Sequence, residues 1–304
     1  MPDSAPSPGD LDPLDLCGVV PPTVTAFDDE GELDEAATAA HARFVVERGA
    51  SAVFPLGTNG EFATLSAPER RQVVETVAGA VDAPVIAGVG APGTQVTVDH
   101  ARHAQRAGVD GVVVVTPYYY PVDADAAVEH YRTVAAAVDL PVYVYHIPGL
   151  TGSRLSLGAI ERIAAIDGVA GLKDSSKELP WLTQAIDANP GLTVLAGSDS
   201  ILFAGLAVGC SGMVSAVANV FPELVVDLYE AYDDGDYGRA RELQSTVLEV
   251  RSALKRGPYM AGVKTALALR ETDFDVGGLR APLRRMGDDD RATLRERLVE
   301  LGLL

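Results

Sequence analysis

The chain has 304 residues, of which 47% are hydrophobic, and a formal net charge of −19. This excess of acid disfavours nucleic acid and anionic membranes as partners, because their phosphates would be repelled. No run approaches the roughly eighteen apolar residues of a membrane span, and no basic-then-apolar signal segment opens the chain, so we expect a cytoplasmic protein.

Basic residues are few and are mostly arginine: the chain has 20 arginines and four lysines. Acidic residues are spread along the whole chain rather than gathered in a tail. This pattern is typical of a surface adapted to high salt, where screening weakens self-repulsion. An ordinary acidic cytosolic enzyme is the alternative.

Short apolar runs follow an acidic, Pro-rich segment, residues 1–15, which we expect to be disordered or extended. The runs read as near-continuous hydrophobic stretches, which is typical of parallel strands buried on both faces. Eight such runs lie at residues 18–27, 51–57, 84–90, 111–117, 141–148, 169–176, 192–199 and 212–217.

Helical patterns alternate with these runs. Ser66 followed by Glu69 forms a capping box, and Asp34 is placed to cap the first helix. We expect helices at about 34–48, 67–82, 95–107, 124–138, 156–165, 179–188 and 200–207. Eight strand–helix units predict an α/β fold, a (β/α)₈ barrel. An open doubly wound sheet is the alternative, but "FDDEGEL" after the first run is not a Gly-rich fingerprint.

The pattern changes after the eighth run. Four further helices are expected, with no strand among them, at about 222–234, 236–255, 259–270 and 288–303. We take the first as the last helix of a barrel that spans residues 16–235. Residues 236–304 then form a C-terminal helical extension.

A metal site is not expected. Only His100 and His103 of the five histidines share a helical face, and no carboxylate or thiolate from a strand end joins them. Cys17 and Cys210 lack metal-ligand spacing and are predicted to be buried free thiols. A Ser-His-acid triad lacks its nucleophile elbow.

Lys173 stands at the end of an apolar run, in "GLKDSS", and active sites of barrels lie at the C-terminal ends of the strands. Desolvation there would lower the pKa of its amine, and a neutral amine attacks carbonyls to form a Schiff base, which serves as an electron sink. A buried ion pair with Asp174 or Asp199 is the alternative.

Other strand ends supply possible partners. Tyr145 ends the preceding run, where its phenol could shuttle protons beside the lysine. A packing role is the alternative. The turn "GTNG" (57–60) offers N–H groups and a hydroxyl that could hold a carboxylate, although it could be a plain tight turn. "GSDS" (197–200) ends a further run.

The motifs "GTNGEFATLS", "TPYYYP", "YHIPGLTG" and "GLKDSS", in that order, resemble the pyruvate-dependent class I aldolase superfamily. This superfamily includes dihydrodipicolinate synthase, N-acetylneuraminate lyase and 2-keto-3-deoxygluconate aldolase. The resemblance covers about residues 18–285. It implies a (β/α)₈ barrel with a C-terminal helical extension, a homotetramer built from dimers, and no cofactor besides the Schiff base.

The resemblance also implies roles for individual residues. Lys173 is the Schiff-base lysine and Tyr145 the proton shuttle. Thr58 and Asn59 fall where the family holds the pyruvate carboxylate. Tyr119 matches a tyrosine that reaches the neighbouring subunit's site in the synthases. Gly197 and Ser198, at another strand end, are further candidates for substrate contact.

Three departures from patterns within the superfamily indicate the branch. Leu150 stands where the synthases have an arginine for the semialdehyde carboxylate. Asn59 replaces a threonine, which we expect to interrupt the tyrosine–threonine relay. Val122 replaces an arginine that binds substrate phosphate in some archaeal 2-keto-3-deoxygluconate aldolases, the branch that "PYYYP" and "GLKDSS" most resemble.

These features predict an aldolase that cleaves an unphosphorylated 2-keto-3-deoxy sugar acid reversibly to pyruvate and an aldehyde. Within the family, the alternatives are a sugar-acid dehydratase and 4-hydroxy-tetrahydrodipicolinate synthase. Outside it, a barrel that binds a phosphate ligand through "GSDS" and "GCSG" and a non-catalytic sensor of pyruvate or a sugar acid remain open.

Overall fold

The computed structural model describes residues 14, 16–270 and 272–304. The expected disordered or extended segment, residues 1–15, therefore lies almost wholly outside the described residues. The division into a barrel (16–235) and an extension (236–304) stays a prediction.

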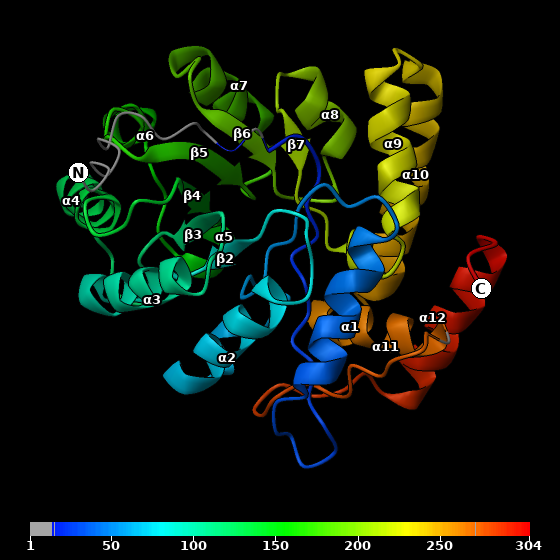
Figure 1. Cartoon of the computed structure of the whole chain (residues 1–304). Coiled ribbons are helices and arrows are strands. Elements are labelled where there is room, and N and C mark those ends of the chain that lie inside the picture. Colours follow the sequence, from blue (N-terminus) through cyan, green and yellow to red (C-terminus); the bar gives the residue numbers. More distant parts are fainter. Residues whose placement is uncertain (1–13, 15, 271) are drawn as a thin grey trace.

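Parallel strands form the centre of the molecule, as the apolar runs predict (Figure 1). Their order in the sheet is β1-β7-β6-β5-β4-β3-β2, so that neighbours in the sequence are mostly neighbours in space. The described residues contain seven strands: β1 (Gly18–Val19), β2 (Ile86–Gly88), β3 (Gly111–Val115), β4 (Val142–His146), β5 (Val169–Asp174), β6 (Thr193–Ala196) and β7 (Gly212–Met213).

The expected strand at 51–57 is not a regular strand, and it is the one run of the eight that differs in this way. It pairs with the segment before β2 through a single parallel bridge between Val53 and Val85. On its other side, the Phe54 N–H donates to the Pro21 carbonyl (3.0 Å). Pro21 has no N–H to donate a second hydrogen bond, so the two segments do not form a regular β-ladder. The segment nevertheless lies between β1 and β2, which completes the (β/α)₈ barrel.

Helices cover the outside of the strands (Figure 1). Every expected helix is present within a few residues of its predicted bounds, whereas α5, η1 and η2 were not expected. The helices that precede β7 are α1 (Glu35–Val46), η1 (Phe62–Thr64), α2 (Ala67–Ala78), α3 (Thr94–Arg106), α4 (Ala124–Ala135), α5 (Pro148–Thr151), α6 (Leu157–Ala164), α7 (Leu179–Ala188) and α8 (Leu202–Ala207).

The predicted caps are confirmed. The Ser66 hydroxyl accepts from the Glu69 N–H, and the Glu69 carboxylate accepts in return from the Ser66 N–H (2.7 Å). The Asp34 carboxylate accepts from the Ala37 N–H (2.9 Å). These bonds satisfy amides that have no partner within the helix.

The C-terminal helices pack against the barrel beside α1 and α8 (Figure 1). They are η2 (Val217–Asn219), α9 (Pro222–Asp233), α10 (Tyr237–Leu254), α11 (Tyr259–Leu269) and α12 (Asp288–Glu300). Lys264 on α11 forms a buried ion pair with Glu61 at 2.8 Å, and it also donates to the Gly278 carbonyl. Because Glu61 follows the "GTNG" turn, this pair fastens the turn to the C-terminal helices.

Two further expectations can be compared with the structure. Cys210 is buried, as predicted, but the prediction was wrong for Cys17, which is exposed. Cys17 stands just before β1, which begins at Gly18, and is therefore not held within the sheet. None of the helices in the described part of the chain has the length and hydropathy that crossing a membrane requires.

Candidate active site

A cavity of about 430 Å³ opens at the C-terminal ends of the strands. Active sites of barrels lie at this end. The candidate residues that line it are Thr58, Asn59, Tyr145, Lys173, Gly197 and Ser198. Six of the seven predicted site residues therefore meet in one place.

Tyr145 and Lys173 lie side by side because of the register between β4 and β5, which pairs these two residues. The Lys173 amine lies 3.3 Å from the centroid of the Tyr145 ring, so that the cation rests on the ring face. The two side chains share the inner face of the barrel.

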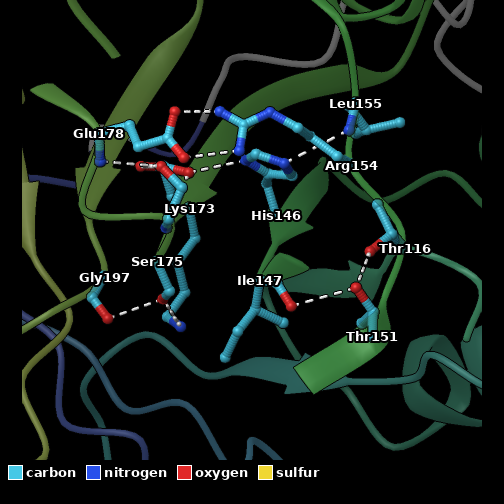
Figure 2. A network of polar contacts seen from close by, with 12 residues as sticks. Thr116, His146, Ile147, Thr151, Arg154, Leu155, Lys173, Ser175, Glu178 and Gly197 are labelled. Atoms are coloured by element: carbon cyan, nitrogen blue, oxygen red, sulfur yellow. Dashed lines mark hydrogen bonds and ion pairs between the residues drawn. The ribbon is translucent and has the colours of Figure 1, made fainter. Parts of the chain in front are cut away.

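Lys173 is 3% exposed and donates to the Ser175 hydroxyl at 3.2 Å. Ser175 in turn donates to the Gly197 carbonyl (2.7 Å), as Figure 2 shows. Among the described residues, no salt bridge involves Lys173, so the alternative of an ion pair with Asp174 or Asp199 does not hold. Burial lowers the pKa of the Lys173 amine, and the Tyr145 phenol and nearby carboxylates offset only part of this effect.

The Tyr145 phenol is buried beside three polar groups. Burial raises its pKa, but the charge of Lys173 and hydrogen bonds with Lys173, Thr58 and Ser175 outweigh burial and lower it. The Thr58 hydroxyl lies 3.3 Å from the phenol oxygen. The expectation that Asn59 interrupts a tyrosine–threonine relay was therefore wrong, because Thr58 is the threonine that contacts Tyr145.

The turn that carries Thr58 and Asn59 is tightly constrained. Asn59 is 5% exposed. A Cβ at Gly60 would lie 3.0 Å from backbone atoms of Leu56 and Thr23, so no other residue fits without a shift. The turn thus has one shape, in which Thr58 faces the cavity.

Gly197 and Ser198 follow β6. A Cβ at Gly197 would lie 2.4 Å from the Ser175 hydroxyl and 2.8 Å from the Asp174 carbonyl. The glycine is therefore required for the close approach that lets Ser175 reach the Gly197 carbonyl. Ser198 is 8% exposed and its hydroxyl accepts from the Ser200 N–H (3.4 Å).

Three predicted positions lie elsewhere or differ in character. Tyr119 is 83% exposed, has a left-handed φ of 77°, and does not line the cavity of its own chain. Leu150 lines the cavity but is 67% exposed and offers no charge. Val122 is absent from the described lining, so its identity says nothing about the charge of a bound substrate.

A buried pair behind the cavity was missed by the sequence analysis. His146 and Asp174 are both fully buried, with Nδ1 and Oδ1 2.8 Å apart. The Leu155 N–H donates to Nε2 (3.3 Å), so Nε2 carries no proton and Nδ1 donates to the carboxylate. The Asp174 carboxylate also accepts from the Ser176 hydroxyl and N–H.

Asp199 also has partners of its own. Its carboxylate accepts from the Ser215 hydroxyl (2.5 Å), the Val217 N–H (3.3 Å) and the Tyr259 phenol (2.6 Å). Burial and the Asp199 charge hold the pKa of Tyr259 well above its ordinary value, which keeps this phenol a donor.

Further lining residues were not predicted. Ser175 stands two residues after Lys173, a spacing that places both on one face of a strand. Arg251 lies on α10, Lys255 is the C-cap of that helix and Tyr259 begins α11, whereas the sequence pattern pointed to strand ends alone. Lys177 follows β5. Because lysine is scarce in this chain, each lysine was a possible site residue, and this pattern could have indicated Lys177 and Lys255.

Histidines at the helix positions considered for metal lie apart from the cavity. His103 pairs with Glu75 at 3.1 Å. In the part of the chain that the structure describes, no group of three His, Cys, Asp or Glu side chains is arranged to hold a metal ion.

Known proteins resemble this chain over nearly its full length. The model of the dihydrodipicolinate synthetase family matches residues 15–301. A DapA-like lyase of Halobacterium salinarum is 65% identical over all of both chains. The 4-hydroxy-tetrahydrodipicolinate synthase of Methanothrix thermoacetophila is 36% identical over 94% of this chain and 97% of its own.

Solved structures agree with these matches. YagE of E. coli K12, described as a prophage protein of the dihydrodipicolinic acid synthase family in complex with pyruvate, superposes with a TM-score of 0.91. It is 32% identical and covers 95% of this chain and 99% of its own. A protein described as a monomeric dihydrodipicolinate synthase variant also has a TM-score of 0.91, with 31% identity over 97% of this chain and all of its own. The chain thus belongs to the dihydrodipicolinate synthetase family and is a lyase built on a (β/α)₈ barrel.

Proposed function

We propose that this lyase is a class I aldolase that forms a Schiff base with pyruvate through Lys173 and cleaves 2-keto-3-deoxy sugar acids. The observation that carries the proposal is the setting of the Lys173 amine, which is buried in the cavity, unpaired with any described carboxylate, and in contact with Tyr145. Both pKa values are shifted toward the forms that proton transfer and imine formation need.

The residues support each step of such a reaction. The neutral Lys173 amine attacks the C2 carbonyl, and water leaves to give the iminium. Tyr145, as phenolate, takes the proton of the C4 hydroxyl, the C3–C4 bond breaks, and its electron pair moves to the nitrogen as the aldehyde departs. Tyr145 then returns the proton to C3, and water releases pyruvate. Thr58 and Asn59 hold the C1 carboxylate beside Tyr145.

Borohydride trapping tests the mechanism. Pyruvate with borohydride should attach irreversibly to Lys173, located by peptide mass spectrometry. Lys173→Ala should lose the adduct and all turnover while keeping its fold by circular dichroism. Lys177→Ala, a lysine of the same cavity, is the matched control and should still form the adduct. An adduct on Lys177, Lys255 or Lys264, or none, contradicts the proposal.

Two outcomes of the same Schiff base are alternatives. A dehydratase would eliminate water from the sugar acid. A 4-hydroxy-tetrahydrodipicolinate synthase would condense pyruvate with aspartate semialdehyde; the names of several relatives and the retained Thr58–Tyr145 contact favour this second candidate. Leu150 disfavours it, since this position lacks the arginine that is expected to bind the carboxylate of the semialdehyde. Product analysis with C5 and C6 keto-deoxy acids, and with the semialdehyde, separates the three.

We also propose a homotetramer. Tyr119 is far more exposed than an aromatic side chain normally is, and its backbone is held in a left-handed conformation, which supports a reach toward a neighbouring subunit. The molar mass of the protein, measured by light scattering at high salt, should be four times that of one chain. A monomer would contradict this and remove the proposed role of Tyr119.

A further inference from the structure

Lysine is concentrated in one cavity. The chain has four lysines, and Lys173, Lys177 and Lys255 all line the pocket described above. The fourth, Lys264, is paired with Glu61 in the interior. A chain that uses lysine so rarely thus places three quarters of it around one ligand site.

We name Lys177, Arg251 and Lys255 the cation rim. Lys177 comes from the loop after β5. Arg251 lies in the last turn of α10, and Lys255 is the C-cap of that helix, four residues further on, so both stand at the same end of α10. The described residues contain no salt bridge to any member of the rim.

The charge balance of the cavity is opposite to that of the chain. Lys173 and the cation rim make four basic residues, against one lining carboxylate, Asp199. Asp199 already accepts three hydrogen bonds, including one from Tyr259. The Tyr259 ring lies 5.9 Å from the Arg251 guanidinium and 5.7 Å from the Lys255 amine, so both cations lie near this ring.

The rim residues also act on one another. Partial burial lowers the pKa of Lys255, and the positive charges of Arg251 and Lys177 lower it further. Lys177 holds a left-handed φ of 68°, a conformation that is strained for a non-glycine residue. Like charges gathered in this way are stabilised by an anion between them.

We propose that the cation rim binds an anionic group, a carboxylate or a phosphate ester, at the end of the substrate distant from its carbonyl. This inference rests on the proposed function, which places C2 on Lys173 and the C1 carboxylate on the Thr58 turn. The rim comes from the C-terminal end of α10 and the loop after β5, which are different elements from that turn. The substrate is therefore a 2-keto-3-deoxy acid with negative charge at both ends.

This inference revises one expectation from the sequence. The prediction of an unphosphorylated substrate depended on Val122, which does not line the cavity. The prediction that no cation binds a second carboxylate depended on Leu150, which follows β4. The cation rim supplies charge from a different element. Arginine suits carboxylate and phosphate equally, because its planar fork matches both.

Kinetics with matched substrates test the inference. Three 2-keto-3-deoxy acids of one stereochemistry, ending in a hydroxymethyl group, a carboxylate or a phosphate, are compared at constant ionic strength. We expect kcat/KM to be at least tenfold higher for one of the two anionic acids than for the hydroxymethyl acid. The preferred acid identifies the anionic group that the rim binds. Arg251→Gln should reduce that value about 10–100-fold, as loss of a charge-assisted hydrogen bond does. The same substitution should change kcat/KM for the hydroxymethyl acid by less than about twofold.

Arg241→Gln is the matched control, because Arg241 is an exposed arginine of the same helix that does not line the cavity. This substitution should leave kcat/KM unchanged for all three substrates. Equal kcat/KM for charged and neutral ends in the wild type, or an equal loss in Arg241→Gln, would overturn the inference.

A binding measurement keeps the inference independent of turnover. Glycerol 1-phosphate, glycerate and glycerol are titrated into the protein at constant ionic strength and followed by ligand-observed NMR. Saturable binding of an anionic probe that Arg251→Gln and Lys255→Gln weaken at least fivefold supports the site. Equal binding by wild type and variants, or by glycerol and the anions, overturns it. Failure to trap pyruvate on Lys173 overturns instead the proposed aldolase mechanism.

Discussion

His146 donates a hydrogen bond to Asp174, and each of these residues directly follows one of the two proposed catalytic residues, Tyr145 and Lys173. Side chains alternate along a strand. The register that brings Tyr145 and Lys173 together inside the barrel therefore brings His146 and Asp174 together on its outer side. The buried pair joins the ends of β4 and β5 and fixes the spacing of the two residues in front of it.

Asp174→Asn should destabilise the protein. The substitution weakens hydrogen bonds from His146 and Ser176 to a buried charge, and such bonds contribute about 1.5–3 kcal/mol each. We expect the free energy of unfolding in urea to fall by about that amount. Asp187→Asn, at an exposed position on α7, should change it by less than about 0.5 kcal/mol. Equal effects would show that the buried pair does not hold the strands.

Tyr145→Phe should lower kcat by about 10²–10⁴-fold, because a general acid–base group is removed. Pyruvate trapping on Lys173 should persist, since the carboxylate contacts remain. Tyr131→Phe, which removes a buried phenol outside the cavity, should keep kcat within about twofold. A loss below tenfold for Tyr145→Phe would assign the proton transfer to another group. His146 is not that group, because both of its ring nitrogens are bonded away from the cavity.

His41 should make the fold sensitive to acid. Its pKa is lowered from 6.5 to about 4, chiefly by burial and also by the charge of Lys264, while a bond to the Asn219 carbonyl opposes the shift. Because the unfolded state takes up the proton first, stability is lost as the pH falls from 6.5 toward 4. The loss at pH 4.5 is about 2–3 kcal/mol.

His41→Gln provides the comparison, since glutamine can still donate to the carbonyl and does not titrate. The difference in unfolding free energy between pH 7 and pH 4.5 should be smaller in the variant by about 2–3 kcal/mol. Identical pH profiles for the two proteins would exclude His41 as the origin.

The fold should be most stable at high salt. The net charge of −19 repels itself in the compact state, and the Debye length shortens from about 10 Å at 0.1 M to about 3 Å at 1 M. The Tm measured in a series from 0.1 to 3 M KCl should rise steeply. A flat series would mean that the acidic surface does not limit stability.

Much of the fold could be predicted because the strands are buried on both faces. Val112 to Val115 and Val142 to Val144 are apolar at successive positions, which is diagnostic of a parallel sheet. The irregular run at 51–57 differed for a local reason, the missing N–H of Pro21. Hydrogen-bond geometry of this kind depends on which carbonyl faces which amide, and no sequence pattern specifies that.

The site was predictable where it lies at strand ends and hidden where it does not. Their positions at strand ends made Lys173 and Tyr145 candidates, and the resemblance of their motifs to a known family implied their roles. The alternation of side chains could also have excluded an ion pair between Lys173 and Asp174, since neighbours on a strand face opposite ways. Arg251 reaches the cavity from a helix nearly 80 residues further along the chain, and only tertiary packing brings it there.

The placement of the four lysines has a practical consequence for labelling chemistry. Lys264 is buried and ion-paired, so apart from the amino terminus the amines that a reagent can reach line the cavity. Acylating dyes and cross-linkers, which usually decorate a protein surface at random, here become directed probes of one pocket. The same reagents used for routine immobilisation would occupy the mouth of that pocket, and a protein attached through its amines would be held by its active-site face.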